Sequence, residues 1–202
     1  MMQKTMEDGL LHAYATRASD VVALLGTGVS PADPDRTIIE AWASTVDGRI
    51  LDVGAGTGRW TGHLARLGHD VEGLEPVPQL VAVARAAHPT VPFREQTIAE
   101  LAEADDRWSG ILAWYSVIHM DPRALAAALT VLHGALAPGG TLLVSHFTGP
   151  APGTLPHPVA PAHRVPPQAM AEAVVAAGFE VAHQRTAPEG LHGILLARRP
   201  RT

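Results

Sequence analysis

The residues best suited to ligand chemistry lie in one short stretch, ILDVGAGTGRW, at positions 50–60. An apolar run leads to Asp52, and glycines then recur at every second position, 54, 56 and 58. This pattern predicts a strand that passes through a tight loop into a helix, because glycine adopts backbone angles that other residues avoid. A nucleotide-like cofactor commonly lies at such a turn in α/β proteins, and a turn that serves only tight packing is the alternative.

The glycine spacing differs from that of dinucleotide-binding proteins, which follow G-x-G-x-x-G. The third glycine is Gly58, and Arg59 stands where the dinucleotide pattern has its last glycine. A second signal is Glu75, which follows the next apolar run 21 residues after Gly54. At neighbouring strand ends, this carboxylate could accept hydrogen bonds from both hydroxyls of a ribose, and it would repel a 2′-phosphate. A solvated glutamate at a strand end is the plain alternative.

Composition excludes several classes of function. The chain of 202 residues contains no cysteine, so disulfides, thiolate metal sites and a cysteine nucleophile are ruled out. The formal net charge is −5 and no basic block occurs, which argues against nucleic acid as a partner. No apolar run reaches the roughly 18 residues needed to span a bilayer, and the N-terminus lacks an apolar stretch long enough for a secretory signal. We therefore expect a cytoplasmic protein with no membrane partner.

Strand and helix signals alternate along most of the chain, which predicts a doubly wound α/β fold built on a parallel sheet. Helices are predicted over 7–26, 36–44, 59–67, 78–88, 121–136 and after 166, and strands over 49–53, 69–74, 91–95, 110–116, 141–147 and in two C-terminal segments. We expect a single domain over 1–202, with an N-terminal helical cap at 1–45 and a core at 46–202. The proline-rich segment 148–167 shows no secondary-structure signal, and it is predicted to be a loop that covers a site.

Four motifs in order carry a family resemblance: ILDVGAGTGRW, VEGLEPVPQLVAVAR, GILAWYSVIHM and LAPGGTLLVS. Together they resemble the class I S-adenosylmethionine-dependent methyltransferases, and the later HRVPPQAMAEAVVAAGFEV resembles the small-molecule branch of that family. The resemblance implies a seven-stranded sheet in the order 3-2-1-4-5-7-6 with strand 7 antiparallel. It also implies S-adenosyl-L-methionine as cofactor and methyl transfer to a small molecule by in-line displacement.

The resemblance assigns candidate roles residue by residue. Glu75 would hold the ribose hydroxyls and Pro76 would flank the adenine. Tyr14 and Arg17, from the N-terminal helix, are candidates for the methionine carboxylate, although an ordinary surface helix is the simpler interpretation. The remaining candidate cofactor residues are Asp52, Gly54, Ala55, Gly56 and Arg59 in the glycine stretch, Gln96, Thr97 and Ile98 after the third strand, and Trp114, Tyr115 and Ser116 at the end of the fourth. At the end of the third strand, the family often has an acidic residue, where this chain has Gln96 and Thr97.

Two histidines are candidate general bases, because histidine titrates near neutral pH. His119 follows the fourth predicted strand and His146 ends the fifth, so both should lie on the ligand side of the sheet. His157 and His163 lie in the proline-rich segment, on no regular element and without a nearby carboxylate, so no metal site is predicted.

Residues and motifs that the chain lacks exclude some classes of methyl acceptor. Without cysteine, methylation of cytosine C5 through a thiolate is impossible, and WYSVIH differs from the Asn/Asp-Pro-Pro-aromatic motif of base amino-group methylation. A small, partly apolar metabolite is the remaining expectation, with oxygen, nitrogen and carbon all open as acceptor atoms. The alternatives are a catalytically silent cofactor-binding protein, an NAD-dependent oxidoreductase and an aminopropyl transferase. The chain is compatible with a homodimer.

Overall fold

The computed structural model describes residues 2–103, 105–187 and 189–201, with no account of the side chains of residues 2–7. The chain forms two compact units that meet in sequence between Thr97 and Ile98. Each unit is a layered α/β arrangement, and the two are described in turn.

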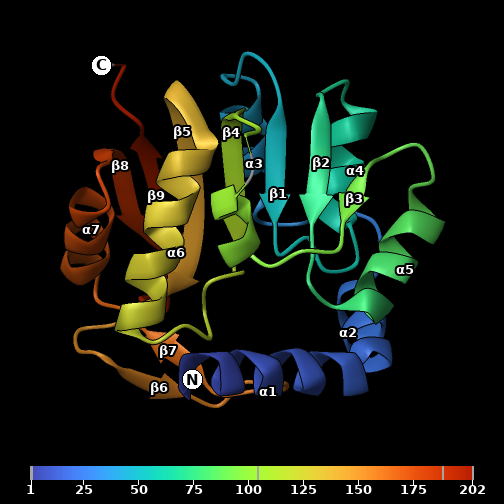
Figure 1. Cartoon of the computed structure of the whole chain (residues 1–202), viewed down its shortest axis with the longest axis horizontal. Helices are drawn as coiled ribbons and strands as arrows, with labels where there is room; N and C mark the ends of the chain where they lie inside the picture. Colours follow the sequence, from blue (N-terminus) through green and yellow to red (C-terminus); the bar gives the residue numbers. More distant parts are fainter. Residues whose placement is uncertain (1, 104, 188, 202) are drawn as a thin grey trace. The chain divides into compact units, whose positions relative to one another are not determined.

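The first unit is built on three parallel strands, β1 (Ile50–Val53), β2 (Val71–Leu74) and β3 (Phe93–Arg94), with β2 in the middle (Figure 1). The connections are two helices, α4 (Arg59–Arg66) and α5 (Pro78–Ala87). Every residue of β1 and β2 is buried. Such short, wholly buried apolar strands are typical of a parallel sheet covered by helices.

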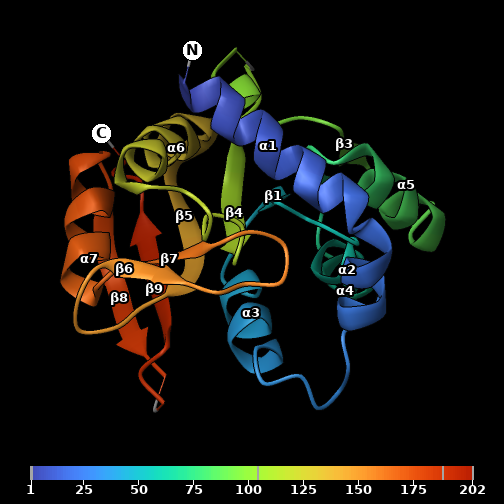
Figure 2. The ribbon, with the colours of Figure 1, turned by 90° about the horizontal axis from the view of Figure 1, so that it is seen from below.

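The N-terminal helical segment consists of α1 (Met2–Thr16), α2 (Ala18–Leu25) and α3 (Arg36–Ala43). The prediction of one helix over 7–26 was wrong in detail, because the chain turns at Arg17, whose N–H is shared between the carbonyls of Ala13 and Tyr14 at 3.2 Å each. Both α1 and α2 pack against α5, as Figures 1 and 2 show from two sides.

The second unit contains four long strands, β4 (Trp108–Trp114), β5 (Leu136–Phe147), β8 (Glu180–Thr186) and β9 (His192–Arg198). β4 and β5 are parallel, and β9 lies antiparallel between β5 and β8 (Figure 1). The strands of the first unit lie in the order β3-β2-β1, and the four long strands of the second unit lie in the order β4-β5-β9-β8. Both orders are those expected. The antiparallel final strand is confirmed.

Helices of the second unit are α6 (Pro122–Ala135), α7 (Pro167–Ala176) and the 3-10 turn η1 (Ala99–Glu103). Asp121 caps the start of α6, because its carboxylate accepts a hydrogen bond from the Ala124 N–H at 2.8 Å. Residues 137–140 form a bulge in β5, since the pairing with β4 jumps from Trp108↔Leu136 to Gly110↔Thr141.

The segment 148–167 is more ordered than predicted. Residues 153–155 (β6, Gly153–Leu155) and 162–164 (β7, Ala162–Arg164) form an antiparallel hairpin, and Arg164 pairs with Phe147 of β5. The prediction of a segment without secondary structure was therefore wrong. The prolines flank the two strands, and none falls on a paired residue, which is where proline would remove a ladder hydrogen bond.

Candidate functional site

The glycine stretch adopts the predicted strand, loop and helix. Gly54, Gly56 and Gly58 have φ angles of 67°, 56° and 75°, in the left-handed region that favours glycine. The loop is tied to the neighbouring strand, because the N–H groups of Gly54 and Ala55 both donate to the Leu74 carbonyl, at 2.8 and 3.0 Å. The sequence pattern therefore specifies a loop whose backbone is held in one conformation.

The glycines of this loop differ in their surroundings. A Cβ at Gly58 would lie 2.9 Å from both Ala84 Cβ and Phe93 Cζ, so Gly58 is required by packing against α5 and β3. A Cβ at Gly56 would come no closer than 4.0 Å to its nearest neighbour, the Gly54 carbonyl oxygen. The packing interpretation thus fits Gly58, whereas Gly56 leaves the backbone open to a ligand.

Glu75 lies directly beside this open position. Its Oε2 accepts a hydrogen bond from the Gly56 N–H at 2.8 Å and its Oε1 accepts one from the Val77 N–H at 3.0 Å. Only 5% of the residue is exposed, and burial raises the pKa of its carboxyl to about 6, against the lowering effect of the two N–H groups. Each oxygen keeps a free lone pair, so the fixed carboxylate can accept further hydrogen bonds.

Tyr14 from α1 lies near this carboxylate. Burial, and then the negative charge of Glu75, raise the pKa of the Tyr14 phenol to about 12. Tyr14 therefore stays neutral and can donate a hydrogen bond beside Glu75. Arg17 is exposed at the break between α1 and α2.

Asp52 is turned toward helix α4. It is 3% exposed, and its Oδ2 accepts a hydrogen bond from the Thr61 hydroxyl at 2.6 Å. Burial raises the pKa of Asp52 to about 7, with Thr61 opposing the rise and the Glu75 charge adding to it. The Asp52 carboxylate thus binds a side chain of α4, the helix that follows the glycine loop.

Arg59 forms an ion pair that the sequence did not indicate. Its Nη2 lies 2.6 Å from Asp33 Oδ2, and its guanidinium carbon lies 4.9 Å from the centre of the Trp60 ring. Both groups belong to the first unit, and the ion pair fastens the segment before α3 to the start of α4. This contact gives Arg59 an anchoring role.

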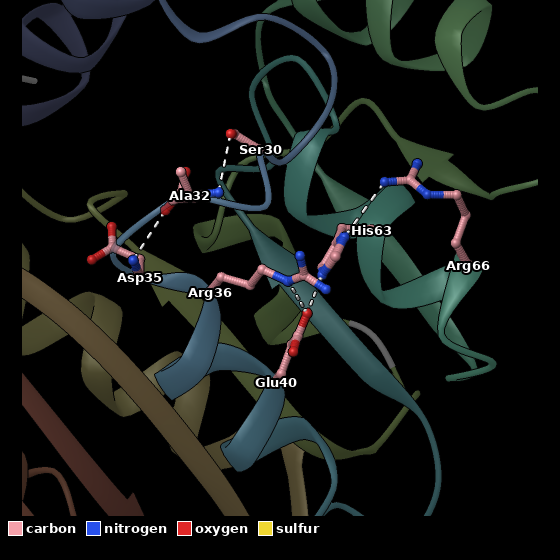
Figure 3. A network of polar contacts seen from close by, with 8 residues as sticks. Ser30, Ala32, Asp35, Arg36, Glu40, His63 and Arg66 are labelled. Atoms are coloured by element: carbon pink, nitrogen blue, oxygen red, sulfur yellow. Dashed lines mark hydrogen bonds and ion pairs between the residues drawn. The ribbon is translucent and has the colours of Figure 1, made fainter.

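A second polar network joins α3 to α4, and Figure 3 shows its members. Glu40 accepts a hydrogen bond from Arg36 Nε at 2.6 Å and contacts His63 Nε2 at 2.7 Å. Arg36 first and His63 second lower the pKa of Glu40. The spacing of Arg36 and Glu40 on one helix could have suggested their pair, but nothing local in the sequence indicates His63.

The loop that follows α2 is held by two contacts to its carbonyl groups. The Thr57 hydroxyl donates to the Gly26 carbonyl at 2.6 Å, and His88 Nε2 lies 2.9 Å from the Thr27 carbonyl. Thr57 belongs to the glycine loop itself. The conformation of that loop is therefore linked to the N-terminal helices.

The remaining candidates of the first unit lie at its strand ends. Pro76 is half-buried directly after Glu75, and Gln96 and Thr97 are half-buried in irregular chain after β3. The structure thus gathers Tyr14, Asp52, Gly56 and Glu75. Ile98, Trp114, Tyr115 and Ser116 belong to the second unit.

In the second unit, Tyr115 follows β4, and both its backbone and its side chain make polar contacts. Its N–H donates to Ser145 Oγ at 2.8 Å, and its hydroxyl lies 2.7 Å from His192 Nδ1. Trp114 packs edge-on against the Tyr115 ring, and Ser116 Oγ is shielded without a hydrogen-bond partner among the described residues. Sequence reasoning missed His192, which lies 77 positions after Tyr115.

The two candidate bases have confined surroundings. His146 is 2% exposed, and its ring fills the space above Gly193, where a Cβ would lie 2.4 Å from His146 Cε1. Burial lowers the pKa of His146 to about 4, and the Val165 backbone offsets only part of this effect. His119 Nδ1 contacts the Pro161 carbonyl at 3.0 Å, and burial lowers its pKa as well. Burial thus favours the neutral form of both rings.

Within the described ranges, no three or more His, Asp or Glu side chains are arranged to hold a metal ion. None of the described helices is long and apolar enough to cross a membrane.

Comparison with known proteins agrees with this geometry. Residues 50–140 match a family model described as a methyltransferase domain. The ubiquinone biosynthesis O-methyltransferase of Cereibacter sphaeroides is 36% identical over 102 residues, which cover 48% of this chain and 40% of that protein. The chain thus spans about two fifths of the length of the curated relatives it matches.

Two solved structures show the same fold. The 1,6-didemethyltoxoflavin-N1-methyltransferase of Burkholderia thailandensis, solved with 1,6-didemethyltoxoflavin and S-adenosylhomocysteine, has a TM-score of 0.79 at 22% identity, covering 98% of this chain and 90% of that one. The glycopeptide N-methyltransferase MtfA, in complex with S-adenosylmethionine, has a TM-score of 0.68 at 19% identity, covering 82% and 93%. The predicted fold class is confirmed. Residues 50–140 thus match a methyltransferase domain, and the chain has the fold of S-adenosylmethionine-dependent methyltransferases of known structure.

Proposed function

We propose that this chain transfers the methyl group of S-adenosyl-L-methionine to a small-molecule acceptor by in-line displacement. The observation that carries the proposal is the Glu75 carboxylate, which two backbone N–H groups hold beside the open backbone of Gly56. An ionised carboxylate so placed suits a pair of ribose hydroxyls, because it can accept from both.

The residues of the first unit fit the family's cofactor. A Cβ at Gly56 would have the Gly54 carbonyl oxygen, at 4.0 Å, as its nearest neighbour, so a ligand has room to contact the loop backbone. Tyr14 is a neutral donor near the negative Glu75. We assign the ribose to Glu75 and the loop contact to Gly54, Ala55 and Gly56, with Tyr14 as a polar neighbour.

The bound cofactor supplies a methyl group on a positively charged sulfur, which is reactive without help from a metal. The tasks left to the protein are to align the acceptor, to exclude water and to take up a proton where the acceptor releases one. A small-molecule acceptor is supported by the relatives, one named for ubiquinone biosynthesis and one for a toxoflavin precursor. These names include an O- and an N-methyltransferase, so both acceptor atoms stay open.

The cofactor assignment is tested by titrating S-adenosylhomocysteine into wild type and Glu75→Gln, with calorimetry well below the melting temperature. The variant keeps the side-chain size but loses the charge and one acceptor. Hydrogen bonds to charged groups contribute roughly 1.5–3 kcal/mol, so affinity should fall about 10- to 100-fold. Glu180→Gln, an exposed carboxylate on β8, is the matched control and should bind as wild type.

Two outcomes would overturn the assignment: no binding to wild type at millimolar ligand, or equal affinity of wild type and Glu75→Gln. Binding of NADH in place of S-adenosylhomocysteine would favour an oxidoreductase. Methyl-tritiated S-adenosylmethionine, incubated with a small-molecule extract, then separates an enzyme from a silent binding protein. Label should move into a small product only when the enzyme is present.

A further inference from the structure

The backbone at Tyr115 is strained. Its φ of 54° is the only positive φ of a non-glycine residue in the described part of the chain. An aromatic residue seldom adopts this conformation, and such strain persists only where the surroundings enforce it, often at functional sites. Here the N–H of Tyr115 is held at 2.8 Å by the hydroxyl of Ser145, a residue of β5 with no exposed surface.

The enforced backbone points the phenol at a histidine. The Tyr115 hydroxyl lies 2.7 Å from His192 Nδ1, and the two ring centres are 5.6 Å apart at nearly right angles. On its far side, His192 Nε2 lies 3.9 Å from the Glu189 carboxylate. The imidazole tautomer with its hydrogen on Nε2 therefore faces a carboxylate and leaves Nδ1 free to accept from the phenol.

The position of His192 is set by the sheet. His192 is the first residue of β9 and pairs with Phe147, the last residue of β5. The Phe147 ring lies 5.5 Å from both Tyr115 and His192. Because β9 is antiparallel to β5, its beginning lies at the carboxyl end of β4 and β5, the end at which open α/β sheets bind ligands.

We propose that Tyr115 and His192 together accept the proton of the methyl acceptor, and that the acceptor is a planar ring carrying an acidic O–H or N–H. This inference rests on the proposed methyl transfer. Tyr115 is the catalytic residue that contacts the acceptor, and His192 takes the proton through it.

The transfer balances in protons and electrons. The acceptor's proton moves to Tyr115 Oη while the phenol's own proton moves to His192 Nδ1. The electron pair released on the acceptor atom forms the bond to the methyl carbon, and the pair of the broken carbon–sulfur bond stays on sulfur. His192 becomes an imidazolium beside Glu189. Its side chain is 37% exposed, so it can release the proton to water afterwards.

The acceptor class follows from the surroundings and from the strength of the base. The Phe147 ring lies 6.5 Å from His157, whose ring is 4.9 Å from His119, and these half-buried rings extend an aromatic surface from the pair. Such a surface suits a planar ring. General-base catalysis by a phenol and an imidazole is most efficient on a group of comparable acidity, which favours an acidic O–H or N–H over a simple alcohol.

The pair is better placed than either histidine predicted from the sequence. His146 is enclosed over Gly193, and His119 is engaged with the Pro161 carbonyl. Among the described residues, Tyr115 at the end of β4 and Glu189 from the segment before β9 are titratable side chains in contact with His192, and Phe147 of β5 packs against its ring. The pH response of the pair should therefore depend on these side chains.

The test uses the full chain with two chromogenic probes, 4-nitrophenol for an acidic O–H and 4-nitroimidazole for an acidic N–H. Absorbance reports ionisation of the bound probe, and methyl-tritiated S-adenosylmethionine reports transfer to the same probe. Wild type is compared with Tyr115→Phe and His192→Gln, and with His183→Gln on exposed β8 as the matched control. Binding of S-adenosylhomocysteine to each variant checks folding and cofactor binding separately.

We expect at least one probe to ionise on wild type at a pH where the free probe is protonated. Tyr115→Phe and His192→Gln should lower kcat by roughly 10²-fold or more, with little change in KM. Both variants should also differ from wild type in the pH profile of kcat. Either of two results overturns the pair: neither probe ionises on wild type, or both variants keep the wild-type pH profile. Failure to bind S-adenosylhomocysteine would instead count against the proposed function itself.

Discussion

Gly62 offers a sharp test of how the first unit is packed. It lies inside α4, and a Cβ there would fall 2.2 Å from Cε1 and 2.3 Å from Nδ1 of His88. The ring cannot move freely, because its Nε2 is held by the Thr27 carbonyl at 2.9 Å and it packs against Phe93. Gly62→Ala must therefore displace His88 and loosen the loop after α2.

The expected magnitude comes from opposing effects. Replacing glycine by alanine inside a helix normally stabilises by about 0.5–1 kcal/mol. Overpacking costs about 1–3 kcal/mol, and losing the hydrogen bond to Thr27 costs about 1 kcal/mol more. We therefore expect Gly62→Ala to lower the free energy of unfolding by roughly 1–3 kcal/mol.

Urea unfolding followed by circular dichroism measures this difference. The matched control is Gly134→Ala in α6, where a Cβ would meet nothing within 4 Å, so alanine should stabilise there. In a His88→Ala background the obstacle is gone, and Gly62→Ala should then become neutral or stabilising. If Gly62→Ala stabilises wild type as much as Gly134→Ala does, the steric argument is refuted.

Two further predictions concern charged groups. Burial raises the pKa of Asp52 to about 7, above the value of about 3.9 in an unfolded chain, so the free energy of unfolding falls as pH rises from about 4 to about 7. Asp52→Asn should remove this pH dependence. In urea titrations, the free energy of unfolding of the variant minus that of wild type should grow by roughly 2–4 kcal/mol between about pH 4 and about pH 7. A constant difference would contradict the assignment. Asp121→Ala should cost about 1 kcal/mol by removing the cap on the Ala124 N–H, whereas Asp121→Asn should be nearly neutral in thermal melts, and equal losses would speak against the cap.

Much of the first unit could be predicted from local sequence. The strand, loop and helix at 50–60 follow from an apolar run and from glycines with positive φ. The proximity of Glu75 to Gly56 follows as well, because consecutive parallel strands place their carboxyl ends side by side. The cap at Asp121 is equally local, since it depends on residues three positions apart.

Contacts between distant segments could not be predicted in the same way. Asp33 and Arg59 are 26 positions apart, and either could equally have been a solvated surface charge. The hairpin at 153–164 was missed because proline content suggested irregular chain, while pairing depends only on the residues between the prolines. His146 and His119 were predicted at the correct strand ends, but only the tertiary structure buries the His146 ring and places His119 against the Pro161 carbonyl.

The sequence by itself determined the fold class, the conformation of the glycine loop and the position of Glu75 beside it, because these depend on periodicity, glycine and strand order. Only the tertiary structure decided how the residues divide their tasks. Gly58 is required by packing because Ala84 and Phe93 lie against it. Gly56 is open because its nearest neighbour is the Gly54 carbonyl oxygen at 4.0 Å. Tyr115 meets His192 because an antiparallel final strand returns to the end of β5, and a contact across 77 positions leaves no local signal in the chain.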